Sequence, residues 1–410
     1  MPTLDPALEH WITKRGVAQI IPEAEFLTRL REGKPLRLKM GFDPSRPDLH
    51  LGHVVGLRKL RQLQELGHHV VVIVGDWTAQ IGDPSGRSDT RTMLTADEVA
   101  ANAETYMRQF FRVVDRDRAE ARYQTEWYGD FGLAEVVRLT SHFTVNQFLH
   151  REDFAKRYGE QAPIAVTELL YPLLQAYDSV AVRADVEFGG TDQLFNLMVG
   201  RELQEKSGQR PQDVFLMPIL PGTDGVRRMG KSLGNYIAIE DPPDEMFGKV
   251  MSLPDNVIPL YYELLTDIPD ADLADMRATL EVRGVNPMSL KKDLGRELVG
   301  FFHGIDAANV AQAEFERVFQ QRETPTEVPE LRVTAATQGA EGLDEGGFTA
   351  DLTRLLHTAG LVGSRGEARR LLHQNGVEVD GQRVGTDPVR LTWGALVRAG
   401  RRRFVRLVRG

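Results

Sequence analysis

The sequence predicts a protein of mixed α/β class, in which an open, largely parallel sheet is followed by an α-helical domain and a small α+β domain. Three observations predict this order. A strand, a helix and a second strand follow one another within residues 36–75, helical patterns replace strand patterns after residue 243, and two short helices precede strand-like residues near the end. At 410 residues, with 41% apolar and 27% charged residues, the chain is long enough for two or three globular domains.

The first elements form a parallel strand, helix and strand unit. Residues 36–43 alternate as in a strand, and Pro44 and Pro47 mark a turn before a helical pattern at 50–66. The run VVVIVG at 70–75 is apolar or small throughout, as in a strand that is buried on both faces. A helical stretch around 167–179, the strand-like ADVEFGG and the apolar VFLMPIL at 214–220 continue the pattern. We therefore expect residues 1–243 to form one α/β sheet domain with insertions.

The rest of the chain divides into three parts. Residues 244–321 show helical patterns without intervening β runs, which predicts an α-helical domain. Residues 322–347 hold two Pro and four Gly with little apolar periodicity, so a linker is expected there. Residues 348–410 are then a small domain of their own, with two short helices followed by VEVDGQRV and its Asp-Gly turn.

Charge is distributed unevenly along the chain. The whole chain carries −9, but residues 348–410 contain 12 Arg and no Lys against five acidic residues, a net charge of +7. A basic segment on an acidic body predicts local binding of a polyanion. A tail that merely improves solubility would have the same composition, so the alternative stays open at this point.

Composition also limits the possible chemistry and location. The absence of Cys excludes disulfides, a thiol nucleophile and zinc held by Cys. The N-terminal residues include acidic side chains and no apolar signal region, and no apolar run approaches the length of about 18 residues that crosses a membrane. We expect a cytoplasmic protein that does not contact a membrane.

The first candidate site is His50-Leu51-Gly52-His53, where the first strand turns into a helix. Backbone N–H groups at a helix N-terminus attract phosphate, and Gly52 carries no side chain that would keep a nucleotide away. Two imidazoles three residues apart could donate hydrogen bonds to phosphate oxygens as charge develops. Helix capping or a surface position is the plainer alternative for such a pair.

The second candidate is Arg228-Met229-Gly230-Lys231-Ser232. Read from Gly225, the string GVRRMGKS satisfies the P-loop pattern, but a P-loop opens a helix, and the following LGNYIAIEDPP is not amphipathic. A mobile basic loop that closes over a triphosphate is therefore the preferred interpretation.

The third candidate is a polar stripe on the helix TELLYPLLQAYDS. Tyr171, Gln175 and Asp178 fall at positions i, i+4 and i+7 among leucines, which places them on one face. Such a stripe needs partners, either within the core or in a ligand.

Together, HLGH and an RMGKS about 175 residues later resemble the two signatures of class I aminoacyl-tRNA synthetases, usually written HIGH and KMSKS. The chain departs from them at Leu51, Arg228 and Gly230. Arg228 keeps the positive charge, whereas Gly230 makes the loop more flexible. The resemblance implies a Rossmann-like catalytic domain with an inserted segment at about 130–170. It also implies a catalytic set of His50, His53, Arg228, Lys231 and Ser232.

The string YPLLQAYD further resembles the substrate-contacting helix of bacterial tyrosyl-tRNA synthetases. The resemblance implies that Asp178 accepts a hydrogen bond from the phenol of tyrosine and that Tyr171 and Gln175 hold its α-amino group. Asp83 of IGDPSG would be a further ligand of that amino group, although Asp-Pro-Ser-Gly also makes a plain turn. Gln193 of GGTDQ would lie near the substrate carboxylate or the adenylate. Lys39 stands where one branch of the family has a Tyr that donates a second bond to the phenol, so the full partner set of the phenol stays open.

ATP is the second substrate that the resemblance implies, with Mg²⁺ on its phosphates, no permanently bound cofactor and no metal site built by the protein. The implied ATP-binding residues are Gly41, Asp43, Gly52, Arg87, Arg91, Gly190, Asp192 and Lys231.

The basic segment resembles the αL-motif RNA-binding module of a ribosomal protein and of the C-terminal end of bacterial tyrosyl-tRNA synthetases. The resemblance implies an anticodon-binding role for the helical domain and contacts from the basic domain to tRNA(Tyr). The implied RNA-binding residues are Ser364, Arg365, Arg369, Arg370, Arg401, Arg402 and Arg403.

The implied activity is that of a tyrosine–tRNA ligase, which forms tyrosyl-adenylate and transfers tyrosine to the 3′-terminal adenosine of tRNA(Tyr). The resemblance implies a homodimer as well, and the inserted segment around 130–170 is our candidate for its interface. Three other classes are considered: a tryptophanyl-tRNA synthetase, a P-loop NTPase, and an RNA-binding protein without catalytic activity.

Overall fold

The computed structural model describes residues 4–44, 48–85, 94–282, 284–320, 328–385, 387–400 and 403–410. The chain forms two compact units, Met1–Asn309 and Val310–Gly410. Among the described residues, no helix is long and apolar enough to cross a membrane.

The larger unit is built on a six-stranded sheet in the order β1-β6-β5-β2-β3-β4. Only β1 runs antiparallel to its neighbour, and the other strands are parallel, so the predicted parallel α/β sheet is confirmed. The predicted strand, helix and strand unit is present as β2, α3 and β3. The strands are β1 (Gln19–Ile21), β2 (Arg37–Phe42), β3 (His69–Val74), β4 (Ala119–Tyr123), β5 (Val186–Gly190) and β6 (Asp213–Met217).

The sheet order reverses at β2, and this creates the crevice of the molecule. From β2 the chain first adds β3 and β4 on one side, and then returns to place β5 and β6 on the other side. Within these strands, β2 and β5 pair at Leu38 with Val186 and at Lys39 with Glu187, although both strands continue further. Their carboxyl ends therefore separate, which is where open α/β sheets bind ligands.

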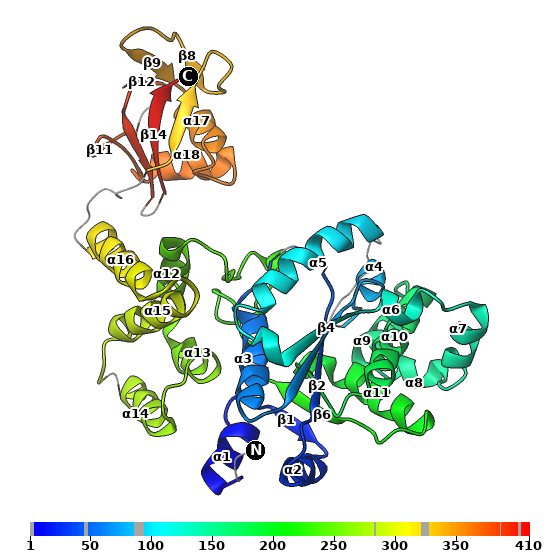
Figure 1. The fold of residues 1–410 in the computed structure, drawn as a ribbon. Helices are drawn as coiled ribbons and strands as arrows, with labels where there is room; N and C mark the ends of the chain where they lie inside the picture. Colours follow the sequence, from blue (N-terminus) through cyan, green and yellow to red (C-terminus); the bar gives the residue numbers. More distant parts are fainter. Residues whose placement is uncertain are drawn as a thin grey trace. The chain divides into compact units, whose positions relative to one another are not determined.

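Helices cover both faces of the sheet. Figure 1 shows the inserted helices α7 (Leu133–Thr140), α8 (Val145–Leu149) and α9 (Glu152–Gly159) beside α10 (Val166–Val182) and α11 (Leu194–Lys206). The insertion is held there by an apolar cluster that includes Phe148, Phe154, Leu173 and Leu203. The remaining helices of this part are α1 (Pro6–Thr13), α2 (Glu23–Arg31), α3 (Leu51–Glu65), α4 (Thr78–Ile81), α5 (Ala96–Phe110) and α6 (Thr125–Tyr128).

The helical segment predicted after residue 243 begins with α12 (Pro243–Met251), and its helix α13 (Ile258–Leu265) packs on α3. Its first helices lie on the side of the sheet away from the insertion (Figure 1). Apolar residues at helical spacing, such as Met246, Phe247 and Val250 of α12, are fully buried. The other helices are α14 (Asp270–Glu281), α15 (Pro287–His303) and α16 (Ile305–Phe315), and a π-helical turn Glu316–Gln320 follows.

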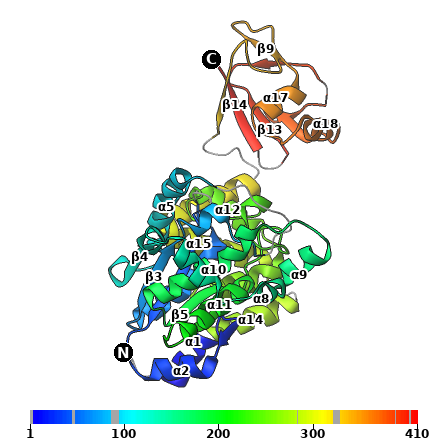
Figure 2. The same cartoon turned by 90° about the vertical axis from the view of Figure 1, so that its right-hand side faces the viewer.

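The smaller unit begins within α16, and its described residues from 328 onward form a five-stranded sheet, a three-stranded sheet and the helices α17 and α18. Figure 2 shows α17 (Leu352–Thr358) and α18 (Arg365–His373) beside strands β13 and β14. Its apolar core includes Phe348, Leu355, Val377 and Leu407. The sheet orders are β11-β10-β13-β14-β7 and β12-β9-β8. Its strands are β7 (Glu330–Val333), β8 (Ala340–Glu341), β9 (Gly347–Ala350), β10 (Val377–Val379), β11 (Gln382–Arg383), β12 (Val389–Thr392), β13 (Leu396–Ala399) and β14 (Arg403–Arg409).

The structure corrects part of the predicted linker at 322–347. Residues Glu330–Val333 form β7, which pairs in parallel with β14, and residues 340–341 form β8. Val333 is fully buried in the core of this unit, so a strand of four residues is enough to fix the segment. Because proline and glycine are frequent in this segment, its sequence pattern indicated a linker and not a strand. The predicted hairpin turn is confirmed, since Asp380 and Gly381 have φ values of 47° and 80° between β10 and β11.

Candidate active site

Two adjoining cavities open where β2 and β5 separate. The larger, of about 590 Å³, is lined by residues of both HLGH and RMGKS. The smaller, of about 310 Å³, is lined by the end of β2 and by one face of α10. The cavities share Met40, His53, Tyr106, Gly189, Gly190 and Asp192.

Backbone pairing brings the two distant motifs together. Leu51 N donates to Ile237 O at 3.0 Å, and Ile239 N donates to Leu49 O at 3.1 Å, so the chain that follows RMGKS is fixed at the start of α3. A Cβ on Gly52 would lie 3.6 Å from Met229 Cβ and 3.0 Å from the His50 ring. The glycine in HLGH therefore permits a close approach of the two motifs.

The two imidazoles of HLGH lie against each other, with ring centroids 3.9 Å apart. His50 N donates to His53 Nδ1 at 3.1 Å, so the proton of a neutral His53 is on Nε2. Burial, and then the charge of Lys231, lower the pKa of His53 to about 4. Burial and the neighbouring His53 also lower the pKa of His50 well below its usual value. Both rings are thus neutral donors at pH 7. Helix capping, the plainer alternative for this pair, therefore accounts for His53 Nδ1, which accepts a hydrogen bond from the backbone.

The RMGKS segment is a turn that the side chain of Asn235, just after the motif, holds in place, and it does not open a helix. Asn235 Oδ1 accepts from Gly230 N at 2.9 Å, and Asn235 Nδ2 donates to Arg228 O at 3.1 Å and Asp224 Oδ2 at 2.9 Å. Only the three-residue turn Lys231–Leu233 follows, which is too short for the helix of a P-loop.

The basic side chains of this segment face the larger cavity. Lys231 Nζ lies 5.4 Å from the centre of the Tyr106 ring, and Arg228 Nη1 lies 3.4 Å from Asp192 Oδ2. Ser232 lines the same cavity. Burial raises the pKa of Asp192.

The end of β2 and the polar stripe of α10 meet in the smaller cavity. Tyr171 Oη donates to Asp43 Oδ2 at 2.8 Å, and Thr78 Oγ1 donates to Asp43 Oδ1 at 2.7 Å. Burial, and then Asp43, raise the pKa of Tyr171 well above its usual value, so Tyr171 keeps its proton. A Cβ on Gly75 would lie 2.4 Å from Asp43 Oδ1, which explains a glycine after β3.

Asp178 lies at the inner end of the smaller cavity and is 2% exposed. Gln124 Nε2 donates to Asp178 Oδ2 at 2.8 Å and Trp127 Nε1 donates to Asp178 Oδ1 at 3.1 Å. Burial raises the pKa of Asp178 to about 7, although the charge of Lys39 opposes this. Each oxygen of the carboxylate retains acceptor capacity for one more donor.

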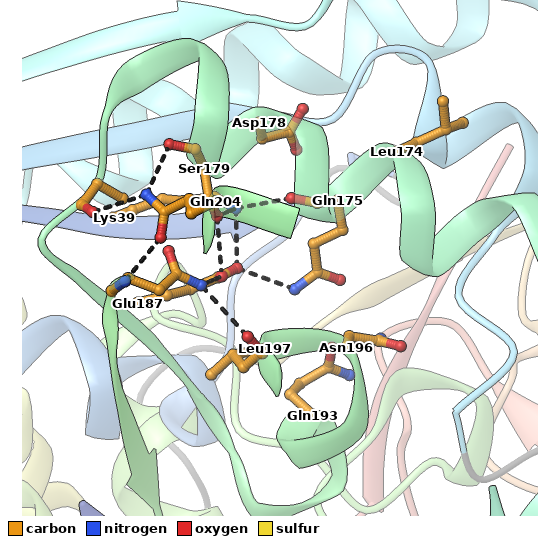
Figure 3. Close-up of polar contacts among 12 residues, drawn as sticks. Lys39, Leu174, Gln175, Asp178, Ser179, Glu187, Gln193, Asn196, Leu197 and Gln204 are labelled. Carbon is orange, nitrogen blue, oxygen red and sulfur yellow. Dashed lines mark hydrogen bonds and ion pairs between the residues drawn. The ribbon is translucent and has the colours of Figure 1, made fainter. Parts of the chain in front are cut away.

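Gln175 is anchored by a buried ion pair at the base of the crevice. Lys39 Nζ donates to Glu187 Oε1 at 2.9 Å, to Ser179 Oγ at 2.7 Å and to the Gln175 carbonyl at 2.8 Å. Gln175 Nε2 donates to Glu187 Oε1 at 3.1 Å, and Figure 3 shows Gln175 reaching from α10 toward Glu187. Lys39 is fully buried and lines neither cavity, so it is directed away from the position that the resemblance gave to a phenol donor.

Most of the remaining predicted ligands line one or both of the two cavities. Gln193 Nε2 donates to Asp83 Oδ2 at 2.7 Å. Gly41 lines the smaller cavity, Gly52 lines the larger one, and Gly190 lines both. Arg87 and Arg91 lie outside the described residues.

The predicted RNA-binding residues belong to the smaller unit. Ser364 Oγ accepts from Glu367 N at 3.2 Å and caps α18, and Arg365 donates to Gln338 at 3.0 Å. Arg369 and Arg370 are exposed on α18. Arg403 pairs with Glu367 at 2.7 Å, whereas Arg401 and Arg402 lie outside the described residues.

Several residues that complete the site were not predicted from the sequence. Gln124 and Trp127 follow β4. Parallel strands place their carboxyl ends at the same edge of a sheet, and this rule could have indicated both residues. The others come from helices whose position depends on the whole fold. The set comprises Thr78, Tyr106, Gln124, Trp127, Arg151 and Asn196.

Known proteins resemble this chain over nearly its full length. The family model for tRNA synthetases class I (W and Y) matches residues 31–320. The tyrosine–tRNA ligase of Dehalococcoides mccartyi strain CBDB1 is 55% identical over 397 residues, which is 97% of this chain and 98% of that protein. The tyrosine–tRNA ligase of Thermotoga maritima is 48% identical over 411 residues, 99% of each chain.

Solved structures show the same fold. Tyrosyl-tRNA synthetase of Archaeoglobus fulgidus, complexed with L-tyrosine, superposes with a TM-score of 0.60 at 26% identity, over 74% of this chain and 98% of that chain. A truncated mitochondrial tyrosyl-tRNA synthetase of Aspergillus nidulans superposes with a TM-score of 0.63 at 20% identity, over 76% and 94% of the two chains. The family match and the nearly full-length similarity show that this chain belongs to the class I tRNA synthetases of the tryptophan and tyrosine group, among the tyrosine–tRNA ligases.

Proposed function

We propose that this chain activates L-tyrosine with ATP to tyrosyl-adenylate and pyrophosphate, and then transfers tyrosine to the 3′-terminal adenosine of tRNA(Tyr). The observation that carries the proposal is the meeting of HLGH and RMGKS around one cavity that adjoins a second cavity ending at Asp178. A nucleotide in the first cavity and an aromatic amino acid in the second would share the wall formed by Met40, His53 and Gly189.

The first step joins the tyrosine carboxylate to the α-phosphorus of ATP. A carboxylate oxygen forms a bond to phosphorus, and the bond from that phosphorus to the bridging oxygen of pyrophosphate breaks. Because the carboxylate is already ionised, no protein base is needed. His53 donates from Nε2, and Lys231 supplies positive charge where charge develops on the leaving pyrophosphate. His50, Arg228 and Ser232 border the same cavity and complete the proposed catalytic set.

Tyrosine is recognised in the smaller cavity. Asp178 accepts the hydrogen bond of the phenol, with its carboxylate held by Gln124 and Trp127. Tyr171, Gln175 and Asp83 surround the α-amino group, and Gln193 lies nearest the carboxylate. A hydrogen-bond acceptor at the inner end of the cavity favours a phenol over the purely apolar ring of phenylalanine, whose binding would leave Asp178 without its partner.

ATP occupies the larger cavity, which Gly52, Gly190 and Asp192 line. Gly41 and Asp43 line the adjoining smaller cavity and are proposed to contact ATP from there, with Arg87 and Arg91 as further predicted contacts. Mg²⁺ is proposed to accompany the triphosphate. Such an ion would be bound chiefly by phosphate oxygens. No resident cofactor is proposed.

The second step and the assembly extend this proposal. A ribose hydroxyl of the terminal adenosine attacks the adenylate, and AMP leaves. Residues 244–321 are proposed to bind the anticodon region, and residues 348–410 to bind tRNA through Arg365, Arg369, Arg370 and Arg403. Exposed apolar residues of the inserted segment, Leu133, Val137, Val145 and Tyr158, support a homodimer that meets there. Because its partner tRNA is cytoplasmic, we propose that location for the chain.

The deciding experiment is ATP–pyrophosphate exchange with each of the twenty amino acids supplied separately. Exchange that depends on tyrosine, followed by esterification of tRNA(Tyr), is the expected result. Exchange that depends on tryptophan would identify a tryptophanyl-tRNA synthetase. ATP hydrolysis without exchange would indicate an NTPase, and RNA binding without exchange would indicate a protein that has kept only the fold.

A further inference from the structure

Arg151 lies in the inserted segment, at the start of α9, and belongs to no predicted site. Its side chain is only 7% exposed. Its Nε pairs with Asp153 Oδ1 at 2.7 Å, and its guanidinium lies 4.9 Å from the Phe154 ring centre and 5.7 Å from that of Phe195. The position of this buried guanidinium is fixed, because its charge is paired with Asp153 and two aromatic rings lie beside it.

Hydrogen bonds connect Arg151 to the substrate cavity in a closed ring of five residues. Arg151 Nη1 donates to Asn196 Oδ1 at 3.2 Å, Asn196 Nδ2 donates to Gln193 Oε1 at 3.0 Å, and Gln193 Nε2 donates to Asp83 Oδ2 at 2.7 Å. The ring closes through Ser85. Ser85 N donates to Asp83 Oδ1 at 2.8 Å, and Ser85 Oγ accepts from Arg151 Nη2 at 3.0 Å. Gln193 and Asn196 lie together in Figure 3.

The direction of every bond in this ring follows from its two charged members. Arginine has only donors and an ionised aspartate only acceptors, whereas each amide could be turned in either of two ways. With Arg151 in place, Asn196 must present its oxygen to the guanidinium and its nitrogen to Gln193. Gln193 must then present its nitrogen to Asp83. Asn196 is 1% exposed, so water cannot replace the arginine in setting this order.

We propose that Arg151 is a positioning residue for tyrosine binding, which fixes the amide of Gln193 and the carboxylate of Asp83 from the inserted segment. The inference rests on the proposed function, because Asp83 and Gln193 are its proposed tyrosine ligands. It adds a role for the insertion in building the substrate cavity, in addition to any contact it makes with another subunit.

The experiment compares Arg151→Met with the unmodified full chain in tyrosine-dependent pyrophosphate exchange and in equilibrium dialysis of radiolabelled tyrosine. Methionine keeps most of the volume and removes the donors. The KM and Kd for tyrosine should rise by about tenfold, the size expected when a charge-assisted hydrogen bond is lost. The KM for ATP should stay within about twofold, and kcat within about threefold, because the ring does not border the larger cavity's basic segment.

Arg157→Met is the matched control. Arg157 is 2% exposed on the same helix and pairs with Glu168 at 3.0 Å, outside the ring. It should lower the thermal midpoint at least as much as Arg151→Met while leaving the KM for tyrosine within about twofold. If both variants lose stability and tyrosine affinity together, the effect of Arg151 is merely structural and the inference is overturned.

A double-mutant cycle tests whether Arg151 acts on Gln193 through Asn196. Asn196→Leu alone should raise the KM for tyrosine about as much as Arg151→Met, and the double variant should be no worse than either single one, because one chain of contacts is cut twice. Arg151→Lys, which keeps one donor, should give an intermediate value and serves if Arg151→Met fails to fold. Multiplicative effects, or a folded Arg151 variant with unchanged affinity, would contradict the inference. An unmodified chain without tyrosine-dependent exchange would instead overturn the proposed function, and the inference with it.

Discussion

Among single residues, His53 bears most directly on the proposed chemistry, because its Nδ1 is engaged by the backbone and its proton is therefore on Nε2. His53→Ala should lower the rate of adenylate formation by about 10²–10³, as for loss of one preorganised donor to a transition state. The Kd for tyrosine should change by less than about twofold, because the proposed contacts that hold the bound amino acid lie around Asp178 in the smaller cavity, whereas His53 acts in the transition state. Single-turnover formation of tyrosyl-adenylate measures both. An equal loss of rate and affinity would show that His53 shapes the tyrosine cavity instead.

Asp178 gives the site a predicted pH dependence. Burial raises its folded-state pKa from 3.8 to about 7, so the folded chain holds this proton more tightly than the unfolded chain does. Ionising Asp178 therefore lowers the free energy of unfolding. This loss is absent below pH 3.8 and complete only above pH 7. Because the carboxylate is the better acceptor for the phenol, kcat/KM for tyrosine should rise through an inflection near pH 7.

Asp178→Asn should remove that inflection, and Asp178→Ala should reduce discrimination against phenylalanine. Exchange kinetics with both amino acids between pH 6 and 8 provide the measurement. A wild-type inflection that persists in Asp178→Asn would assign it to another group.

At the scale of elements, the Lys39–Glu187 pair joins β2, β5 and α10 at the point where the crevice begins. Both side chains are at most 1% exposed, so removing one partner leaves a buried charge. Lys39→Met should lower the free energy of unfolding by about 3–5 kcal/mol. Glu187→Gln in the same chain should recover at least about 1 kcal/mol, because no net charge then stays buried. Urea unfolding of the single and double variants checks this, and a double variant no more stable than Lys39→Met would count against the electrostatic explanation.

The RMGKS turn depends on one side chain from outside the motif. Asn235 is 3% exposed and bonds to Gly230, Arg228 and Asp224. Asn235→Ala should free the turn and lower kcat of exchange by about 10–100-fold, because misplacing Lys231 by about 1 Å is costly in the transition state. Tyrosine Kd should stay unchanged, since Asn235 lines neither cavity. Stopped-flow kinetics separates the two, and a wild-type kcat would show that the turn orders itself when ATP binds.

The elements that the sequence predicted are those with long apolar patterns. β2, α3, β3, β5 and β6 show such patterns, and so does the polar stripe on α10. The short edge strands β1 and β4 do not. Contacts such as those of Gln124 with Asp178 could not be predicted, because they join elements that only the sheet order places side by side. The buried role of Lys39 was likewise hidden, since a lysine in an alternating strand is usually exposed.

At the scale of the whole molecule, the two units have different charge and separate cores. The smaller unit buries Phe348, Leu355, Val377 and Leu407 in a cluster of its own, while the family match ends at residue 320. The chemistry of adenylate formation is proposed to reside in the larger unit and the polyanion contacts in the smaller. Variants in one unit should therefore affect one step of the reaction.

Arg369 and Arg370 provide the test of this division, because both are exposed on α18 of the basic segment, residues 348–410. The double variant Arg369→Gln/Arg370→Gln should raise the KM for tRNA and reduce the slope of log affinity against log salt by about 1–2, since about 0.7–0.9 counterions are released for each phosphate contact. Pyrophosphate exchange should be unchanged. The charge-matched control is Arg354→Gln/Arg390→Gln, whose arginines already pair with Asp351 and Asp344 of the same unit. Equal changes of slope in both double variants would mean that only net charge matters and that α18 is not a specific RNA-binding surface.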